Sequence, residues 1–194
     1  MLRSLFMLLF WAGAAWAEPV GITKDTMSVS VATADSSVEI SRSQDTENTI
    51  DAQWALTSRP CPPFCIQPMS PAEGVTTIGE LEVLNFLQDP KALVIDGRIR
   101  PEFEAGTIPG AISVPYNEAA DRLGELGCDP DFEGYECSDD VPMVVLFCNG
   151  PWCGQSPSAA RRMIDAGYPS EKIYYYRGGM QVWQSLGLTV VPGK

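Results

Sequence analysis

The chain has 194 residues, a formal net charge of −12 and no histidine. Such an acidic chain is repelled by phosphate backbones and anionic lipid, so nucleic acid and membrane surfaces are poor partners. The absence of histidine excludes metal sites built on imidazole and every catalytic pair in which histidine is the base.

The first 17 residues have the layout of a cleavable secretory signal. A basic residue near the start precedes an apolar stretch from Leu5 to about Trp11, and a small-residue cleavage motif ends at Ala17. This stretch is shorter than the roughly 18 apolar residues that a membrane-spanning helix needs. We expect cleavage after Ala17 and a periplasmic or secreted protein that is free of the membrane; the alternative is an uncleaved anchor.

Residues 18–75 are rich in Ser, Thr and Asp and poor in large apolar residues, so we assign them to an N-terminal extension. TMSVSVAT and SSVEIS alternate polar and apolar residues on either side of Ala34-Asp35, which favours a β-hairpin. A disordered leader is an equally good interpretation because the apolar content is low. The proline-rich stretch RPCPPFCIQPMSPAEG then excludes a helix and indicates an extended connector.

The six cysteines fall into three close pairs, which are Cys61/Cys65, Cys128/Cys137 and Cys148/Cys153. An even number of cysteines in an exported protein favours disulfides, although their connectivity cannot be read from a sequence. We expect the bonds Cys61–Cys65 and Cys128–Cys137, because an oxidising compartment consumes free thiols. The alternative for these four cysteines is a shared zinc site.

From residue 76 onward, helical and strand patterns alternate. A possible capping box at Thr77 and Glu80 precedes the helical pattern ELEVLNFL, and ALVID and VPMVVLF are typical of strands buried on both faces. Further helices are predicted over RPEFEAGT, residues 117–126, SPSAARRMIDAG and MQVWQSLG, and further strands over AISVP and KIYYY. The acidic insert around Asp129 to Asp140 is predicted to form a solvated loop. The alternation predicts an α/β fold with an open, mainly parallel sheet over residues 76–194.

Cys148 follows the buried strand VPMVVLF and precedes a helix, which is where ligands bind in open α/β sheets. Because Gly150 and Gly154 lack a Cβ, the turn between them can point successive backbone N–H groups at the cysteine sulfur. Ser156 is a natural N-cap of the following helix. Amides and the helix dipole stabilise negative charge, so we expect a thiolate or persulfide anion at Cys148 without any imidazole base.

Three segments resemble the rhodanese domain family over about residues 76–191. LVIDGRIRPEFEAGTIPGAISVP is similar to the family signature Asp-x-Arg, Glu-Phe, Gly-His-Ile-Pro-Gly-Ala, with Asp96 and Arg98 in place. VVLFC, with its loop and a helix ending in AGY, puts Cys148 at the position of the sulfur-carrying cysteine, and YYYRGGMQVWQSLGLTV resembles the closing strand, turn and helix. The resemblance implies a rhodanese-like open parallel sheet flanked by helices, and a sulfurtransferase without metal or organic cofactor.

Two features depart from the family pattern. Thr107 replaces the mostly structural histidine of the Gly-His-Ile-Pro-Gly-Ala motif. The loop from Cys148 to Ser156 is two residues longer than the common Cys-x-x-Gly-x-Arg-Ser loop, contains Cys153 and lacks the arginine. The longer loop could admit a larger acceptor, whereas loss of the guanidinium weakens the binding of a dianion such as thiosulfate. Arg161 or Arg162 on the next helix could compensate.

We predict that Cys148 takes sulfane sulfur from a small anion such as thiosulfate or polysulfide and passes it to cyanide or to an acceptor thiol, which could belong to a protein. The predicted substrate loop comprises Asn149, Gly150, Pro151, Trp152, Gly154, Gln155 and Ser156. Asp96 and Arg98 are expected to organise neighbouring loops by an ion pair rather than to take part in the chemistry.

Two other roles for Cys148 remain open. With Cys153 it could form a redox pair, in which Cys153 also resolves a persulfide by expelling hydrosulfide. The same two residues could instead form an inert disulfide in a non-catalytic interaction module. A phosphatase is disfavoured, because Gly154 and Gln155 stand where such a loop needs an arginine to hold phosphate.

Overall fold

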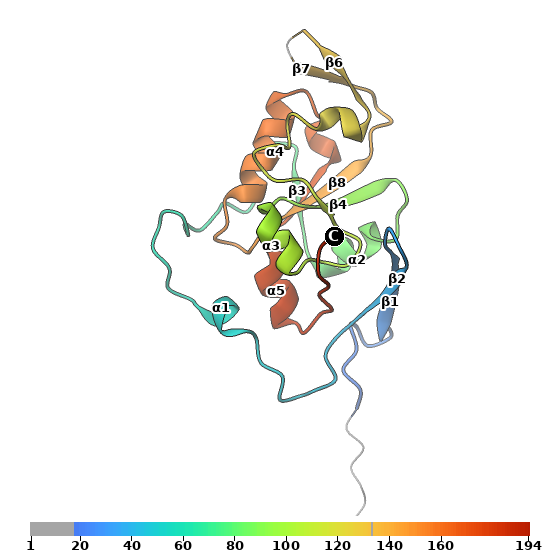
Figure 1. Cartoon of the computed structure of the whole chain (residues 1–194), viewed down its shortest axis with the longest axis vertical. Coiled ribbons are helices and arrows are strands. Elements are labelled where there is room, and N and C mark those ends of the chain that lie inside the picture. The colour runs from blue at the N-terminus through green and yellow to red at the C-terminus, as the bar shows by residue number, and fades with distance from the viewer. Residues whose placement is uncertain (1–17, 133) are drawn as a thin grey trace, which may run out of the picture.

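The computed structural model describes residues 18–132 and 134–194, so the predicted signal over residues 1–17 lies outside the described residues. A five-stranded parallel sheet runs through the molecule in the order β3-β9-β8-β4-β5 (Figure 1). Its strands are β3 (Thr76–Ile78), β9 (Ile173–Tyr176), β8 (Met143–Phe147), β4 (Ala92–Asp96) and β5 (Ile112–Ser113). The expected α/β fold with a rhodanese-like parallel sheet is confirmed.

The two faces of the sheet pack against different elements, and the side chains of β8 alternate between them. Val144 and Leu146 enter a core with α4 (Gln155–Asp165) and the 3-10 helix η1 (Leu123–Leu126). Val145 and Phe147 enter a second core with α2 (Glu80–Phe86) and α5 (Gly179–Ser185). Because both faces are buried, the apolar run of β8 needs no polar alternation.

The carboxyl ends of the parallel strands meet at one edge of the sheet. Asp96 at the end of β4 is level with Phe147 at the end of β8, and Phe147 is level with Tyr176 at the end of β9. Residues that directly follow these strands therefore come together. Helix α3 (Arg100–Ala105) follows β4 at this edge, and the 3-10 helix η2 (Ser170–Lys172) precedes β9 at the opposite edge.

The extension begins with an antiparallel hairpin of β1 (Ser28–Ala32) and β2 (Ser37–Ser41), in which Val31 pairs with Val38. Val31 and Ile40 are buried in the core that α2 and α5 share. The amide of Thr189 donates to the carbonyl of Ser41 at 3.1 Å, which joins the hairpin to the C-terminal segment. The hairpin interpretation is thus the right one, and the disordered leader is wrong.

After the hairpin, the connector crosses the outside of the molecule through the short helix α1 (Ala52–Ala55) before it enters β3 (Figure 1). A disulfide joins Cys61 to Cys65 within this connector. No helix of residues 18–132 and 134–194 has the length and apolarity that a membrane crossing requires.

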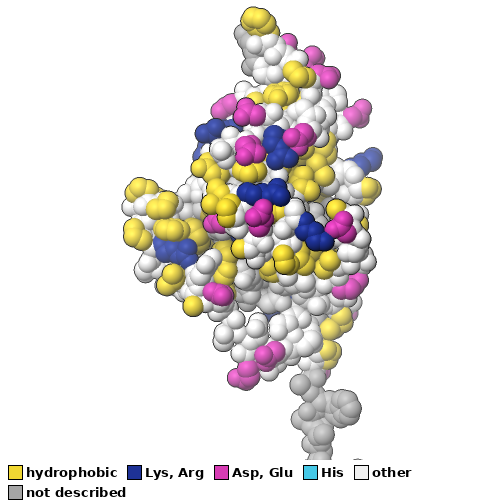
Figure 2. All heavy atoms as spheres, in the orientation of Figure 1, with side chains coloured by type: hydrophobic (Ala, Val, Ile, Leu, Met, Phe, Trp, Pro, Cys, Tyr) yellow, Lys and Arg dark blue, Asp and Glu magenta, His cyan; other side chains and the backbone are white. Residues whose placement is uncertain are grey.

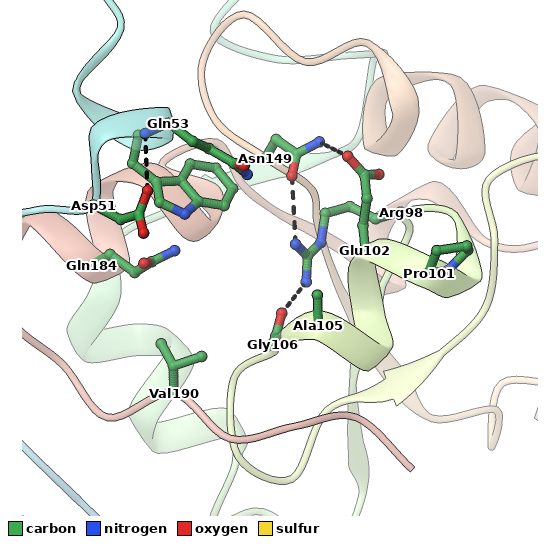
Figure 3. A pocket seen from close by; sticks show the side chains of 11 residues that line it. Asp51, Gln53, Arg98, Pro101, Glu102, Ala105, Gly106, Asn149, Gln184 and Val190 are labelled. Carbon is green, nitrogen blue, oxygen red and sulfur yellow. Dashed lines mark hydrogen bonds between the residues drawn. The ribbon is translucent and has the colours of Figure 1, made fainter.

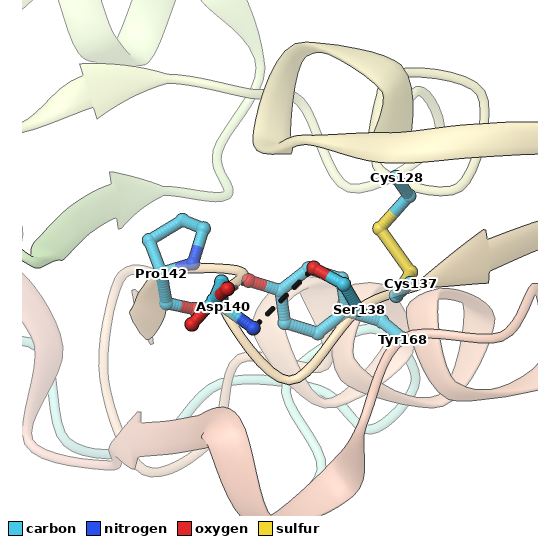
Figure 4. The surroundings of a disulfide bond; sticks show 6 residues. All are labelled: Cys128, Cys137, Ser138, Asp140, Pro142 and Tyr168. Atoms are coloured by element: carbon cyan, nitrogen blue, oxygen red, sulfur yellow. Dashed lines mark hydrogen bonds between the residues drawn. A yellow bond between two sulfur atoms is a disulfide. The ribbon is translucent and has the colours of Figure 1, made fainter.

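The acidic insert is more ordered than the expected loop. It forms an antiparallel hairpin of β6 (Cys128–Asp131) and β7 (Gly134–Cys137), in which Cys128 faces Cys137 and is joined to it by a disulfide (Figure 4). The nearby Tyr168 hydroxyl donates to the carbonyl of Pro142. Since Cys61, Cys65, Cys128 and Cys137 are bonded in two separate pairs, none of them supplies a thiolate for the shared zinc site, and that alternative is wrong.

Three local predictions are wrong. The capping box does not use Thr77, which lies in β3; α2 starts at Glu80, and Glu82 accepts from the amide of Gly79 at 3.0 Å. Residues 116–122 form turns instead of a helix, and only Leu123–Leu126 is helical. Helix α4 starts two residues earlier than an N-cap at Ser156 implies, so its N-cap is Gly154 and Ser156 lies inside the first turn.

Candidate active site

Cys148 directly follows β8 and is buried, with 2% of its surface exposed. Its backbone is fixed by the start of α5, because the amide of Met180 donates to the Cys148 carbonyl at 2.9 Å. The amide of Gln181 donates likewise to Asn149 at 2.9 Å. Elements that are distant in sequence thus hold the first two residues of the loop in place.

Gly179 makes this close approach possible. It has a φ of +55°, and a Cβ on it would overlap the Cys148 carbonyl oxygen and lie 2.7 Å from the Gly150 amide nitrogen. We expect Gly179→Ala to lower the free energy of unfolding by about 1–3 kcal/mol, because a left-handed conformation is strained for alanine. Urea unfolding measures the effect. Gly124→Ala is the control, since a Cβ there meets only an ordinary contact at 3.8 Å; equal losses in the two variants would contradict the prediction.

Hydrogen bonds at the loop stabilise a negative charge on Cys148. Burial by itself raises the pKa of this thiol, but donors from the Cys153 thiol, the Ser156 hydroxyl and the Ser156 and Gly150 amides outweigh burial and lower it. When Cys148 is a thiol, its sulfur lies 3.4 Å from the Cys153 carbonyl, to which it can donate. Deprotonation removes that contact and leaves the donors to hold the anion.

Cys153 has the opposite electrostatics. The pKa of its thiol is raised, first because its S–H donates to the Cys148 sulfur, then because of burial and the negative charge on Cys148. Its sulfur also lies 3.3 Å from the side-chain oxygen of Gln155. The surroundings therefore favour the thiolate form at Cys148 and the protonated thiol at Cys153. Both residues are free cysteines among those described, so no disulfide joins them here.

Ser156 acts on Cys148 from the first turn of α4. Its hydroxyl is buried and has no other hydrogen-bond partner among the described residues, so its proton is available to a thiolate. We expect Ser156→Ala to raise the pKa of the Cys148 thiol and to slow its alkylation at pH 7 about tenfold, because a hydrogen bond to a charged group contributes roughly 1.5 kcal/mol. Alkylation rates measured against pH test this. An unchanged pH profile would rule out the hydroxyl as a donor.

Asp96 and Arg98 form a buried ion pair at the same edge of the sheet. The guanidinium of Arg98 donates to the Asp96 carboxylate at 2.6 and 2.9 Å and to the carbonyl of Gly106 at 2.6 Å. Thr107 donates its hydroxyl to Asp96 at 2.8 Å. A threonine therefore gives Asp96 a hydrogen-bond donor at the position where the family has histidine.

This network extends to Asn149, the residue after Cys148 (Figure 3). The side-chain oxygen of Asn149 lies 3.5 Å from Arg98, and its amide donates to Glu102 at 2.9 Å. The Asp96–Arg98 pair is thus connected to the site by the contact of Arg98 with Asn149, and not by a contact with the Cys148 sulfur. Glu102 belongs to the Glu-Phe part of the signature, but its contact with Asn149 was not predicted from the sequence.

A polar cavity of about 550 Å³ opens beside Asn149. It lies between α3 and the connector helix α1, and its walls include Trp54, Arg98, Glu102 and Gln184 (Figure 3). The buried Asp96 already neutralises Arg98, which leaves the carboxylates of Asp51 and Glu102 uncompensated on the cavity wall. The cavity is consequently a poor place for an anion.

The remaining loop residues form the outer wall of the site. The Trp152 indole donates to Gln181 at 2.8 Å, and the amide of Cys153 donates to the Gly150 carbonyl at 2.9 Å, which tightens the turn. Arg161 does not take the place of the missing loop arginine, because its guanidinium donates to the Pro71 carbonyl at 3.3 Å. Arg162 is exposed in the last turn of α4.

Comparison with known proteins gives one family. The model of the rhodanese-like domain matches residues 81–186. The chain is 34% identical over 124 residues to the HTH-type transcriptional regulator Rv0324 of Mycobacterium tuberculosis, an alignment that covers 64% of this chain and 47% of that protein. The chain therefore spans about half the length of that relative.

Two further similarities cover the same region. The uncharacterized protein YibN of Escherichia coli K12 is 29% identical over 121 residues, which cover 62% of this chain and 75% of that protein. Among solved structures, a thiosulfate sulfurtransferase from Pseudomonas aeruginosa is 26% identical with a TM-score of 0.45 and covers 62% of this chain and 21% of that one.

Proposed function

Because the chain belongs to the rhodanese-like domain family, we propose that it is a sulfurtransferase in which Cys148 carries sulfane sulfur as a persulfide. The observation that carries this proposal is the asymmetry of the two loop thiols. The donors around Cys148 lower its pKa, whereas the pKa of Cys153 is raised. Only the thiolate attacks sulfur, so the environment selects Cys148 as the nucleophile.

In the first step the Cys148 thiolate attacks the outer sulfur of the donor. With thiosulfate, the bond between the two sulfur atoms breaks, sulfite leaves with the electron pair, and Cys148 becomes a persulfide anion. The amides of Gly150 and Ser156 and the Ser156 hydroxyl, which stabilise the thiolate, are placed to hold this anion as well. No proton has to move, which suits a chain that has no histidine.

In the second step an acceptor thiolate, or cyanide, attacks the outer sulfur of the persulfide. The sulfur–sulfur bond breaks, the acceptor leaves as a persulfide or as thiocyanate, and the Cys148 thiolate is regenerated. The same hydrogen bonds stabilise the leaving thiolate. Charge is therefore conserved in both steps, and the loop needs no metal or organic cofactor.

The charge around the loop favours a donor with a single negative charge. The loop has no arginine, and Arg161 is engaged by Pro71. A dianion such as thiosulfate therefore lacks a bidentate partner. We propose that a persulfide or a singly protonated polysulfide, each with one negative charge, is the better donor and that the acceptor is a thiol on a small molecule or a protein.

We also propose that residues 1–17 are a cleaved export signal, that residues 18–75 are an extension and that residues 76–194 carry the rhodanese-like domain. The protein would then work in the periplasm or outside the cell. Two disulfides, Cys61–Cys65 and Cys128–Cys137, support this location, because disulfides persist in oxidising compartments.

Intact-protein mass spectrometry tests the proposal. After incubation with polysulfide or thiosulfate and removal of the donor, we expect a gain of about 32 Da, the mass of one sulfur atom on a thiolate. A thiol acceptor or cyanide should then remove it. The same mass before and after incubation with either donor, in protein whose Cys148 is shown to be reduced, would overturn the proposal.

A second candidate is thiol–disulfide exchange through Cys148 and Cys153. It is favoured by the contact between the two thiols, which lowers the pKa of Cys148 and raises the pKa of Cys153. Attack of Cys153 on the inner sulfur of a Cys148 persulfide would form a disulfide and release hydrosulfide. A loss of about 2 Da with release of hydrosulfide, in place of the gain of one sulfur, would favour this candidate.

A further inference from the structure

The connector lies directly on the Cys148 loop. We use the name lid for residues 59–67, which include the Cys61–Cys65 disulfide. The amide of Gln67 donates to the carbonyl of Pro151 at 2.9 Å, a backbone hydrogen bond between the lid and the middle of the loop. The lid therefore contacts the loop between Cys148 and Cys153.

An aromatic contact holds the first half of the lid. The ring of Phe64 packs edge-on against Trp152 with 4.9 Å between ring centroids. The guanidinium of Arg59 lies 4.6 Å from the Trp152 ring and 4.9 Å from the Phe64 ring. Cation–π contacts of this kind hold a surface segment against an aromatic side chain. Figure 2 shows hydrophobic side chains gathered around basic ones on the lobe that the connector forms.

Hydrogen bonds hold the second half. Arg177, which follows β9, donates to the Gln67 carbonyl at 2.9 Å. The Gln67 side chain lies over Gly154, where an added Cβ would be 3.6 Å from its nitrogen, and it donates to the Cys65 carbonyl at 2.8 Å. The lid thus contacts the loop at Pro151, Trp152 and Gly154, and the two loop cysteines, Cys148 and Cys153, are only 2% and 5% exposed.

The Cys61–Cys65 disulfide lies between these two sets of contacts. It closes the turn that contains Phe64, and this turn lies between Arg59 and Gln67 in the chain. Cys61 is exposed and Cys65 is half-buried, so a reductant can reach the bond from solvent. Cys128–Cys137 joins the hairpin β6–β7 and makes no contact of this kind with the loop.

We propose that residues 59–67 are a redox-sensitive lid that closes Cys148 while Cys61–Cys65 is oxidised and opens when that disulfide is reduced. A dithiol reductant would supply two electrons and two protons, so that the bond becomes two thiols and the reductant becomes a disulfide. The released turn would then lose the geometry that holds Phe64 and Gln67 on the loop. The inference rests on the proposed function, since it names how the same sulfur is made accessible.

The rate of Cys148 alkylation by iodoacetamide, located by peptide mapping, tests the lid without requiring sulfur transfer. In Cys61→Ser/Cys65→Ser we expect this rate to rise at least tenfold over the wild-type chain. Cys128→Ser/Cys137→Ser removes the other disulfide and should change the rate less than twofold. Phe64→Ala keeps both disulfides, removes the contact with Trp152 and should also raise the rate several-fold.

An alkylation rate in Cys61→Ser/Cys65→Ser and in Phe64→Ala that equals the wild-type rate would overturn the lid. An equal rise in the alkylation rate of Cys128→Ser/Cys137→Ser would also overturn the lid, since it would indicate that the loss of either disulfide loosens the whole fold. Persulfide formation in the same variants separates the two proposals. Fast alkylation without a gain of one sulfur would support the lid and overturn the sulfurtransferase proposal. A gain of one sulfur with an unchanged alkylation rate would support the sulfurtransferase and overturn the lid.

Discussion

Replacing Cys148 with serine should abolish the gain of one sulfur and lower sulfur transfer at least about a thousandfold. A serine hydroxyl stays protonated at neutral pH, and its oxygen cannot take over the role of a sulfur-carrying thiolate. The amides of Gly150 and Ser156 would remain in place, but the anion that they stabilise would be missing. Mass spectrometry and a thiocyanate assay with cyanide as acceptor measure the two effects.

Cys153→Ser is the matched control, because it changes the other thiol of the same loop. Cys153 donates to the Cys148 sulfur, so this variant should keep the sulfur gain and transfer sulfur only several-fold more slowly. The reverse pattern, with the sulfur gain kept in Cys148→Ser and lost in Cys153→Ser, would show that Cys153, and not Cys148, is the nucleophile.

The second large effect is expected at the buried ion pair. Asp96→Asn should lower the free energy of unfolding by about 3–5 kcal/mol, because it leaves a buried guanidinium without its counter-charge. The side chains of Arg98 and Asp96 are 3% and 0% exposed. Thr107 would also lose its charged acceptor. Urea unfolding followed by circular dichroism measures the loss.

Glu104→Gln removes one partner of an exposed pair and serves as the comparison. Arg100 and Glu104 are 2.9 Å apart, but both side chains are more than half exposed. Solvent screens such pairs, so the change should stay below about 1 kcal/mol. If Asp96→Asn unfolds at the same urea concentration as Glu104→Gln, the pair does not stabilise the carboxyl edge of the sheet.

The parallel sheet could be predicted because the apolar run of each central strand is visible in its own short segment of sequence. ALVI and MVVLF are apolar throughout, as required for strands covered on both faces, and both are followed directly by polar or cysteine residues of the site. The position of Cys148 follows from that pattern, as do the amides around it. The spacing of Cys61 to Cys65 and of Cys128 to Cys137 likewise favoured the two pairs that the structure joins.

The wrong predictions concern segments whose conformation depends on distant contacts. Ala119, Leu123 and Leu126 have helical spacing and are all buried, yet only Leu123–Leu126 is helical, since these three side chains can be buried without a continuous helix. Ser156 reads as an N-cap, but Gly154 takes that position and leaves the serine hydroxyl inside the site. Propensity is a weak guide when tertiary contacts decide.

The lid could not be predicted at all. The contact of Gln67 with Pro151 and that of Phe64 with Trp152 join segments more than 80 residues apart, and no periodic pattern marks either segment. The proline-rich composition indicated only that the connector is not helical. Its position on the active-site loop emerges from the packed structure.

The pH dependence of Cys148 alkylation, measured in Cys61→Ser/Cys65→Ser so that access does not limit the rate, tests the central claim most directly. The hydrogen bonds around the sulfur predict that the rate reaches half its maximum below pH 8.5, about the ordinary pKa of a cysteine. A midpoint at or above that value would show that burial prevails over the amides and hydroxyl, and that Cys148 is not a nucleophile held ready as a thiolate.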